Sequence, residues 1–343
     1  MSQTASLELE KALDSFVQTI KHKANKQDRV GERTATSYRR NVRFFAGWLA
    51  EERDKTLLEA ETSDLRVYLQ QCVADGDKDN TIKTRRSAIS RFYGELPAMA
   101  SDGKVGVSPD DCPPNPEAEY DATWTVSETH KQEQSGEEIQ YLKHEEVKSL
   151  YSNVPAPTVR NRLLVRLLYQ TAMRVSEATH IKLSHIDRDA REITVPAATS
   201  KSNSRTVAYK PSLDSLLRRW IDGGYRDGEH YAQSSPYLFP TAQAEKISRE
   251  TVRTVIIEAA ENAGLDNSTI YTDNAGNERK RISPHILRHS MAVNSLKAGT
   301  LNVRELQDIL GHSELETTEK YLKIASDDAT DKYHNTGGPP EGD

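Results

Sequence analysis

Apolar residues recur at helical spacing through residues 7–97, which predicts a small unit built only from helices. The first apolar stripe consists of Leu9, Leu13, Phe16, Val17 and Ile20. Three more amphipathic helices are predicted over Thr34–Glu51, Asp64–Val73 and 81–96. No strand pattern interrupts them.

A second apolar pattern begins at Leu142 and mixes helices with short strands. Helices are predicted over His144–Ser152, Arg160–Met173, Leu213–Ile221 and Ser248–Ala263. Two β-rich runs, Glu192–Val195 and Arg205–Tyr209, flank a polar, turn-rich segment and predict a β-hairpin. Residues 271–282 have turn chemistry and are interpreted as a polar insertion, and 283–324 is mostly helical. The predicted fold class is mainly α: an all-helical N-terminal domain plus an α+β domain with a small β-hairpin or sheet.

The segment between these patterns is rich in Pro, Asp and Glu, with Tyr120 and Trp124 as its large apolar anchors. It reads as a linker. The predicted organisation is therefore a helical domain at 1–97, an acidic linker at 98–138, a second domain at 139–326 and an acidic tail at 327–343.

Charge is distributed unevenly over the 343 residues, whose formal net charge is −6. Residues 1–97 hold 17 basic and 15 acidic residues, and residues 139–326 hold 26 and 22. The linker holds 2 against 10 and the tail 1 against 5, so the acid lies outside both predicted domains. The overall charge thus leaves a nucleic-acid partner open, provided that the basic surface is local. The remaining acidic residues suit a high-salt cytoplasm, as in a halophilic or archaeal host.

Several absences narrow the class of protein. The sequence has no run of 18 apolar residues, so we expect no membrane partner, and its first residues lack the pattern of a signal peptide. Cys72 and Cys112 have neither metal nor redox spacing, which favours a reducing interior. A soluble cytoplasmic protein is the expectation.

The stretch from Ser283 to Ile324 gathers residues that could meet one phosphate group. His285 and Arg288 are three residues apart and project from one face of a predicted helix. His312 follows a helix-breaking glycine, and Tyr321 lies nine residues further on. The ordered set of two imidazoles, a guanidinium and a phenol indicates phosphate-transfer chemistry.

Four segments together resemble the motifs of the tyrosine recombinases, the phage-integrase or Xer-like family. TAMRVSEATHIKLSHID at 171–187 resembles the first arginine box, and TSKSNSRTV at 199–207 resembles the lysine-bearing hairpin. SPHILRHSMA at 283–292 resembles the His-x-x-Arg box, and ILGHSELETTEKYLKI at 309–324 resembles the box that ends in the nucleophile. The helical unit before them is similar to the family's core-binding domain.

The resemblance implies a role for each matched residue. Arg174 and Arg288 would hold the two non-bridging phosphate oxygens with planar guanidinium groups. Tyr321 would be the nucleophile, His285 would assist its deprotonation and His312 would hydrogen-bond a non-bridging oxygen. Lys201 would protonate the departing 5′ oxygen. Glu177 would support the pocket by bracing an arginine or a histidine.

This chemistry implies neither a cofactor nor a metal, because the arginines supply the positive charge and the covalent bond to tyrosine makes ATP unnecessary. The sequence has no His, Cys and Asp cluster of metal-ligand spacing and no phosphate-cradling glycine-rich loop. It departs from the family at Ala172 and Met173, where a glycine and an aliphatic residue usually precede the arginine.

The expected partner is double-stranded DNA. Two basic helix faces of the first domain are candidates for clamping its backbone, namely Arg39, Arg40 and Arg43 on one and Lys83, Arg85, Arg86 and Arg91 on the other. The leading hypothesis is a site-specific recombinase or integrase that works through a covalent 3′-phosphotyrosyl intermediate, as a tetramer on two paired sites. The alternatives are DNA relaxation like that of a type IB topoisomerase, and an inactive DNA-binding factor on the same scaffold.

Overall fold

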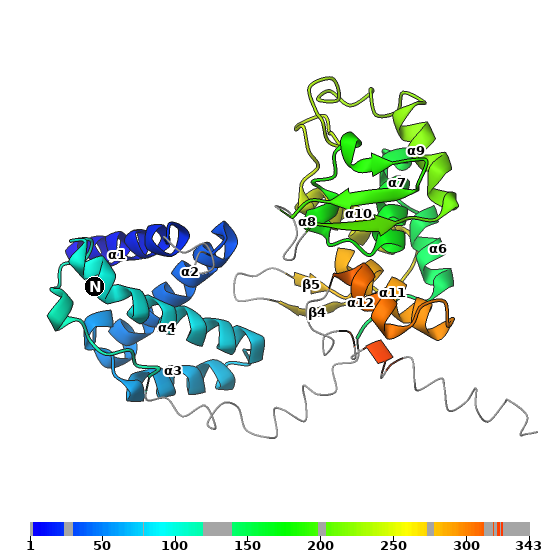
Figure 1. Cartoon of the computed structure of the whole chain (residues 1–343). Helices are drawn as coiled ribbons and strands as arrows, with labels where there is room; N and C mark the ends of the chain where they lie inside the picture. The colour runs from blue at the N-terminus through cyan, green and yellow to red at the C-terminus, as the bar shows by residue number, and fades with distance from the viewer. Residues whose placement is uncertain are drawn as a thin grey trace, which may run out of the picture. The chain divides into compact units, whose positions relative to one another are not determined.

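The chain forms two compact units, residues 1–137 and residues 138–343, in a computed structural model (Figure 1). The structure describes residues 3–23, 30–77, 79–118, 139–197, 204–272 and 278–311, together with 318, 321, 322 and 324. Tyr120, Trp124 and the acidic tail lie outside these residues. The fold class predicted from the sequence is confirmed. No helix within the described ranges has the length and apolarity that crossing a bilayer requires.

The described part of the first unit is a bundle of four α-helices. These are α1 (Gln3–Lys21), α2 (Glu32–Trp48), α3 (Thr62–Ala74) and α4 (Asp79–Ser101). Between α2 and α3 lie a π-helical turn (Leu49–Arg53) and a 3₁₀ turn (Leu57–Glu59), and a second 3₁₀ turn (Pro109–Asp111) follows α4. Helix α4 continues past Pro97, where the linker was predicted to begin.

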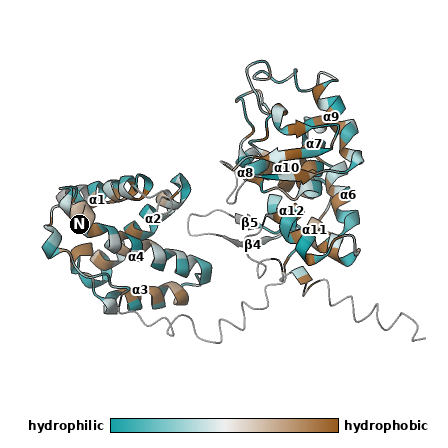
Figure 2. Cartoon of the chain, in the orientation of Figure 1, coloured by the Kyte–Doolittle hydropathy of each residue, from teal (hydrophilic) through white to brown (hydrophobic). Residues whose placement is uncertain are grey.

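Aromatic rings form the centre of this bundle. Phe16 of α1 meets Phe92 of α4 edge to face, with ring centroids 5.4 Å apart, and Phe45 of α2 lies 5.1 Å from Tyr68 of α3. Figure 2 shows the polar and apolar faces that such helices present to solvent and to the core. The helical spacing read from the sequence therefore predicted the correct inner faces.

The second unit surrounds the central helix α7 (Thr158–Thr171), which carries the buried leucines Leu163, Leu164, Leu167 and Leu168. The helices around it are α6 (His144–Ser152), α8 (Val175–Ala178), α9 (Asp214–Ile221), α10 (Arg249–Asn262), α11 (Pro284–Lys297) and α12 (Val303–Leu310). Two 3₁₀ turns, Leu183–His185 and Pro211–Leu213, precede β1 and α9. Helices α9 and α11 both pack on α7.

A three-stranded antiparallel sheet lies beside these helices, in the order β1 (Ile186–Asp187), β2 (Glu192–Val195) and β3 (Arg205–Ala208). The predicted hairpin is β2–β3, with Val195 opposite Arg205, and β1 was not predicted. A second hairpin, β4 (Thr269–Thr272) with β5 (Glu278–Lys280), begins two residues before the region interpreted as a polar insertion and extends into it. Most residues of these two strands are polar, so apolar alternation did not predict them.

The prediction that Arg85 lies on a DNA-binding face of α4 is wrong. The sequence placed it outside, but it is buried, and its guanidinium pairs with Asp77 at 2.7 Å and donates to the Tyr68 hydroxyl at 2.8 Å. Three residues after the core residue Ile82, it lies on the edge of the apolar stripe, where Asp77 balances its charge. Arg85 is therefore a structural residue of the bundle.

We predict that Arg85→Ala lowers the free energy of unfolding by about 3 kcal/mol, because it removes the buried guanidinium that pairs with the largely buried Asp77 carboxylate. The exposed Arg40 on α2 is the matched control, and Arg40→Ala should stay within about 0.5 kcal/mol of wild type. Urea unfolding followed by circular dichroism measures both. Equal stability of the two variants would contradict the structural role of Arg85.

Candidate active site

The first arginine of the site is positioned by the break between α7 and α8. Helix α7 ends because Ala172 adopts the left-handed conformation, with φ 49° and ψ 24°. Arg174 then precedes α8, and its backbone N–H donates to the Glu177 carboxylate at 2.8 Å. The Ala172 side chain is fully buried, at the position where the family usually has glycine. The left-handed backbone conformation costs an alanine about 1 kcal/mol.

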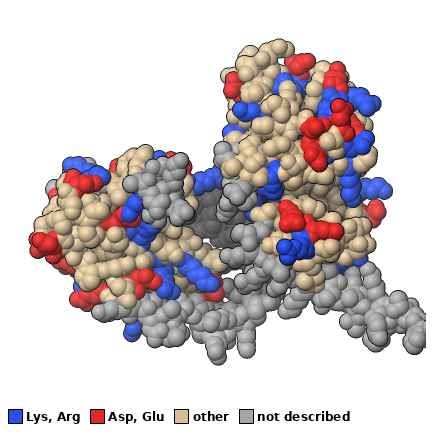
Figure 3. Space-filling model, viewed as in Figure 1, with Lys and Arg blue, Asp and Glu red and all other residues tan. Residues whose placement is uncertain are grey.

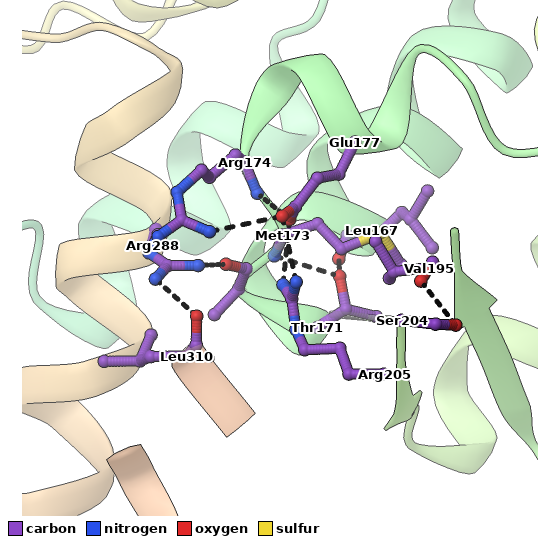
Figure 4. A network of polar contacts seen from close by, with 11 residues as sticks. Leu167, Thr171, Met173, Arg174, Glu177, Val195, Ser204, Arg205, Arg288 and Leu310 are labelled. Carbon is purple, nitrogen blue, oxygen red and sulfur yellow. Dashed lines mark hydrogen bonds and ion pairs between the residues drawn. The ribbon is translucent and has the colours of Figure 1, made fainter. Parts of the chain in front are cut away.

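Glu177 holds two arginines from different parts of the chain (Figure 4). Its fully buried carboxylate pairs with Arg174 at 3.2 Å and with Arg205 of β3 at 2.9 and 2.8 Å. The sequence predicted that Glu177 would brace an arginine or a histidine, and the structure shows two arginines.

The charge of Glu177 follows from these contacts. Burial by itself would raise the pKa of Glu177, but hydrogen bonds from Arg205 and from the Arg174 backbone, with the charges of both arginines, outweigh burial and lower the pKa. The carboxylate is therefore ionised at neutral pH. It orients Arg174 while leaving about a fifth of the Arg174 side chain exposed.

Arg288 enters the site from α11. Its guanidinium donates to the carbonyl of Ala172 at 2.6 Å and to that of Leu310, at the end of α12, at 2.7 Å (Figure 4). Burial, and next the charge of Arg174, lower the pKa of Arg288 to about 10. It stays charged at neutral pH, close enough to Arg174 for the two cations to act on one anion.

Tyr321 lies in the same buried cluster as Ala172, Leu306 and Leu310, and only 3% of it is exposed. Burial raises the pKa of the Tyr321 phenol, while the charges of Arg288 and Arg174 lower it, and the net pKa is raised. The phenol therefore keeps its proton at neutral pH until a base takes it.

A base is in place. Nδ1 of His289 lies 2.7 Å from the Tyr321 hydroxyl oxygen, within hydrogen-bonding distance. One turn earlier on α11, the exposed His285 has its ring centroid 5.7 Å from that of His289. The three rings form a file from His285 through His289 to Tyr321, since the His289 and Tyr321 centroids are also 5.7 Å apart.

The structure therefore brings together Arg174, Glu177, Arg288 and Tyr321, with His285 at the outer end of the file. Lys201 and His312 fall outside the described residues. Sequence reasoning missed His289 and Arg205. Both had a signal, because His289 is four residues after His285 on the same helix face and Arg205 begins the strand after the lysine-bearing turn.

Gly311 ties α12 to the same site. It ends α12 in the left-handed conformation, with φ 62°. A Cβ atom at this position would lie 3.1 Å from Cδ of Arg205 and 3.2 Å from its Nε, so a larger residue would press on the arginine that Glu177 holds.

The predicted DNA-binding residues of the first unit have differing surroundings. Arg39 pairs with Glu10 and Asp14, and Arg43 also pairs with Glu10. Acidic and basic side chains are interspersed on the visible face of each unit (Figure 3). These pairs reduce the net charge that Arg39 and Arg43 offer to a phosphate.

An open groove of about 520 Å³ lies between α2 and α4. Its lining consists of Arg33, Thr34, Ser37, Tyr38, Asn80, Lys83, Thr84 and Ser87. Lys83 also lines an adjoining groove of about 680 Å³, together with Arg86 and Arg91. Arg86 pairs there with Glu117 and Arg91 with Glu95. Hydroxyl and amide groups beside cations are the groups that contact a phosphate backbone.

Two family models match the chain. The model described as "Phage integrase family" matches residues 140–327, and the one described as "Phage integrase, N-terminal SAM-like domain" matches residues 12–98. Together they cover the site and the helical bundle.

Relatives among known proteins carry matching names. The chain is 30% identical over 188 residues to the tyrosine recombinase XerA of Pyrococcus furiosus, a match that covers 54% of this chain and 57% of that protein. It is 25% identical over 319 residues to the tyrosine recombinase XerC of Anoxybacillus flavithermus, covering 92% and 93%.

A solved structure of the XerH site-specific recombinase, bound to a palindromic difH substrate in a post-cleavage complex, superposes with a TM-score of 0.67 over 97% of both chains. The Tn1549 transposon integrase, in complex with transposon right end DNA, superposes with a TM-score of 0.63 over 94% of this chain and 99% of its own. The identities are 15% and 16%, so these likenesses establish the fold.

We predict that protonation of Glu177 at low pH lowers the free energy of unfolding. Its pKa is lowered in the folded state, so the carboxylate contributes stability that is complete above the ordinary value of 4.5 and is lost as pH falls through the folded pKa. The slope of unfolding free energy against pH below 4.5 should therefore be shallower in Glu177→Gln than in wild type. Urea unfolding over a pH series measures this slope. Identical slopes would show that the arginines do not hold the charged form.

Proposed function

The chain belongs to the phage integrase family and is a tyrosine recombinase, and from that premise we propose how it cuts and rejoins DNA at specific sites. Tyr321 attacks a backbone phosphate and the bond from phosphorus to the 5′ oxygen breaks. The DNA end remains attached through a 3′-phosphotyrosyl bond. The reverse reaction, with a 5′ hydroxyl of the partner strand, rejoins the DNA without ATP because the covalent bond is retained.

One observation carries the proposal: a buried phenol, a hydrogen-bonded imidazole and two neighbouring guanidinium groups occupy one pocket. Attack on a phosphodiester adds negative charge to its non-bridging oxygens, so fixed cations stabilise the transition state more than the ground state. Arg174 and Arg288 supply those cations, and both are oriented before DNA binds by Glu177 and by two backbone carbonyls.

The proton of Tyr321 passes to His289 as the oxygen attacks. The geometry supports this assignment because Nδ1 of His289 is 2.7 Å from the hydroxyl, whereas His285, the base implied by the family resemblance, lies one helical turn away on the exposed side. His285 is then placed to meet a phosphate oxygen.

The departing 5′ oxygen needs a proton, and Lys201 is the proposed donor. His312 is proposed to hydrogen-bond a non-bridging oxygen. Both assignments rest on the matched motifs. The contact between Arg205 and Glu177 supports the assignment of Lys201. Arg205 begins β3 four residues after Lys201, and this contact ties that strand to the site.

We further propose that the helical unit binds the DNA backbone through the groove between α2 and α4, whose lining includes the cations Arg33 and Lys83. The exposed Arg40 of α2, which does not line the groove, is proposed as a further contact. Arg39, Arg43, Arg86 and Arg91 would reach phosphates only by exchanging their carboxylate partners. Recombination pairs two duplex sites, so the working assembly is proposed to be a tetramer on DNA in the cytoplasm. The topoisomerase and inactive-factor alternatives have no observation that favours them.

A suicide DNA substrate, which traps the covalent intermediate, tests the chemistry. We expect wild type to form an adduct that survives denaturing electrophoresis, and Tyr321→Phe to form none while still binding DNA. Arg288→Ala should lose cleavage by about 100-fold or more, because one transition-state cation is gone. An adduct in Tyr321→Phe would show that the nucleophile is a different residue, and no adduct in wild type on a genomic library of sites would refute the proposal.

The two histidines are separated by the pH dependence of cleavage. If His289 is the base, His289→Gln should lower the single-turnover rate by about 100-fold and remove the acid limb of the pH profile. His285→Gln should lower the rate while keeping that limb. The reverse pattern would assign the proton transfer to His285.

A further inference from the structure

Two lysines, Lys182 and Lys246, lie against the ring of Tyr237, just beyond α8. Together with His180, these residues are called here the Tyr237 cluster. The ammonium of Lys246 is 5.5 Å from the centroid of the tyrosine ring and that of Lys182 is 5.8 Å from it. All four residues are half-buried, and none has a role in the site described above.

The backbone holds the cluster in place. Lys182 and Tyr237 pair across an isolated antiparallel bridge. On either side, Leu183 N–H donates to the Pro236 carbonyl at 3.0 Å and Leu238 N–H donates to that of Ile181 at 2.8 Å. These bonds hold Lys182 beside Tyr237. The Ile247 N–H donates to the Phe239 carbonyl at 2.8 Å, which brings the neighbouring Lys246 back toward the same segment.

His180 orients Lys246. Its Nδ1 lies 2.7 Å from the Ser176 carbonyl, which can only accept, so Nδ1 carries the proton. Nε2 is then an acceptor, and the Lys246 ammonium donates to it at 2.5 Å. The imidazole is neutral in this arrangement and fixes a side chain that would otherwise be mobile.

The positive charge of the cluster has no acidic counterpart. Among the described residues, no carboxylate pairs with Lys182 or Lys246, in contrast to the arginines of the helical unit. The charge of Lys182, after burial, also lowers the pKa of neighbouring His185. Half-buried cations held together by a neutral histidine and an aromatic face, without a carboxylate, are suited to an external anion.

The cluster lies close to the pocket along the chain. The helical hydrogen bonds that begin at Arg174 continue through Thr179 to His180, which donates its N–H to the Glu177 carbonyl at 2.9 Å. Helix α8 and the turn after it separate Arg174 from His180 by six residues, or about 9 Å at the rise of an α-helix. Successive phosphates of one DNA strand advance by about 3.4 Å along the axis, so an anion at the cluster would be a few nucleotides from the one that Arg174 holds.

We propose that Lys182 and Lys246 bind a DNA-backbone phosphate that flanks the cleaved one, and that His180 is the positioning residue that holds Lys246 for this contact. This second phosphate site deepens the proposed function and rests on it. It fixes the register of the strand relative to Tyr321, because a duplex held at two phosphates cannot slide past the nucleophile.

Salt dependence of DNA binding tests the site. The full chain is titrated with a fluorescent duplex of random sequence at a series of KCl concentrations, and the slope of log K against log[KCl] is measured by anisotropy. The double variant Lys182→Gln with Lys246→Gln should lower the magnitude of this slope by about 0.9, the value for one phosphate contact. Its affinity at low salt should fall by about tenfold.

The matched control is Lys148→Gln on α6, an exposed lysine whose ammonium is 3.7 Å from Glu145. It should leave both slope and affinity unchanged, and thermal unfolding should show that all variants are folded. An unchanged slope in a folded double variant would overturn the phosphate site.

His180 has its own prediction within the same titration. His180→Gln keeps an acceptor for Lys246 and should preserve the slope, whereas His180→Leu removes the acceptor and should lower affinity as Lys246→Gln does. Wild-type binding by folded His180→Leu would overturn the positioning role.

The adduct assay keeps the two proposals apart. An adduct in wild type with an unchanged slope in the double variant overturns the second phosphate site alone. A reduced slope in the double variant, with no adduct in wild type, overturns the proposed chemistry and supports the phosphate site.

Discussion

The buried carboxylate of Glu177 is the interaction on which the site depends. It joins Arg174, just before α8, to Arg205, the first residue of β3. Burying the carboxylate costs desolvation energy, and its attraction to the two guanidinium groups offsets that cost. Because the carboxylate has no exposed surface, solvent does not compete for it, and it fixes the orientation of Arg174, the proposed phosphate ligand. The pocket is thus preorganised, which is what electrostatic stabilisation of a transition state requires.

The backbone supports the second arginine in an analogous way. Arg288 donates to two carbonyls, one at the end of α7 and one at the end of α12, so two helix ends and α11 converge on a single guanidinium. Carbonyls at helix ends lack intrahelical partners and carry partial negative charge, so they attract a cation without adding a formal charge. Tyr321, the proposed nucleophile, packs against the same two helix ends, since it belongs to the cluster that contains Ala172 and Leu310.

The sequence predicted local features well and distant pairings poorly. Helix periodicity found the bundle and the central helix α7, and motif order found Arg174, Glu177, Arg288 and Tyr321. Arg205 and His289 were missed because their roles arise from contacts 28 and 32 residues away in the chain. Arg85 was misplaced for a related reason. A cation at the edge of an apolar stripe turns inward only if a carboxylate from another segment meets it, and spacing along one helix does not show this.

Gly311 leaves space that two arginines of the site need, so a steric change at this glycine would alter the positions of charged groups. The hydrogen atom on its inward face leaves room for the Arg205 side chain, and its left-handed backbone ends α12 where the Leu310 carbonyl meets Arg288. One added methyl group would push on Arg205 and strain the turn beside Arg288, so both arginine systems would be disturbed by a residue that bears no charge. The absence of a side chain at Gly311 therefore allows the guanidinium groups of Arg205 and Arg288 to keep their positions.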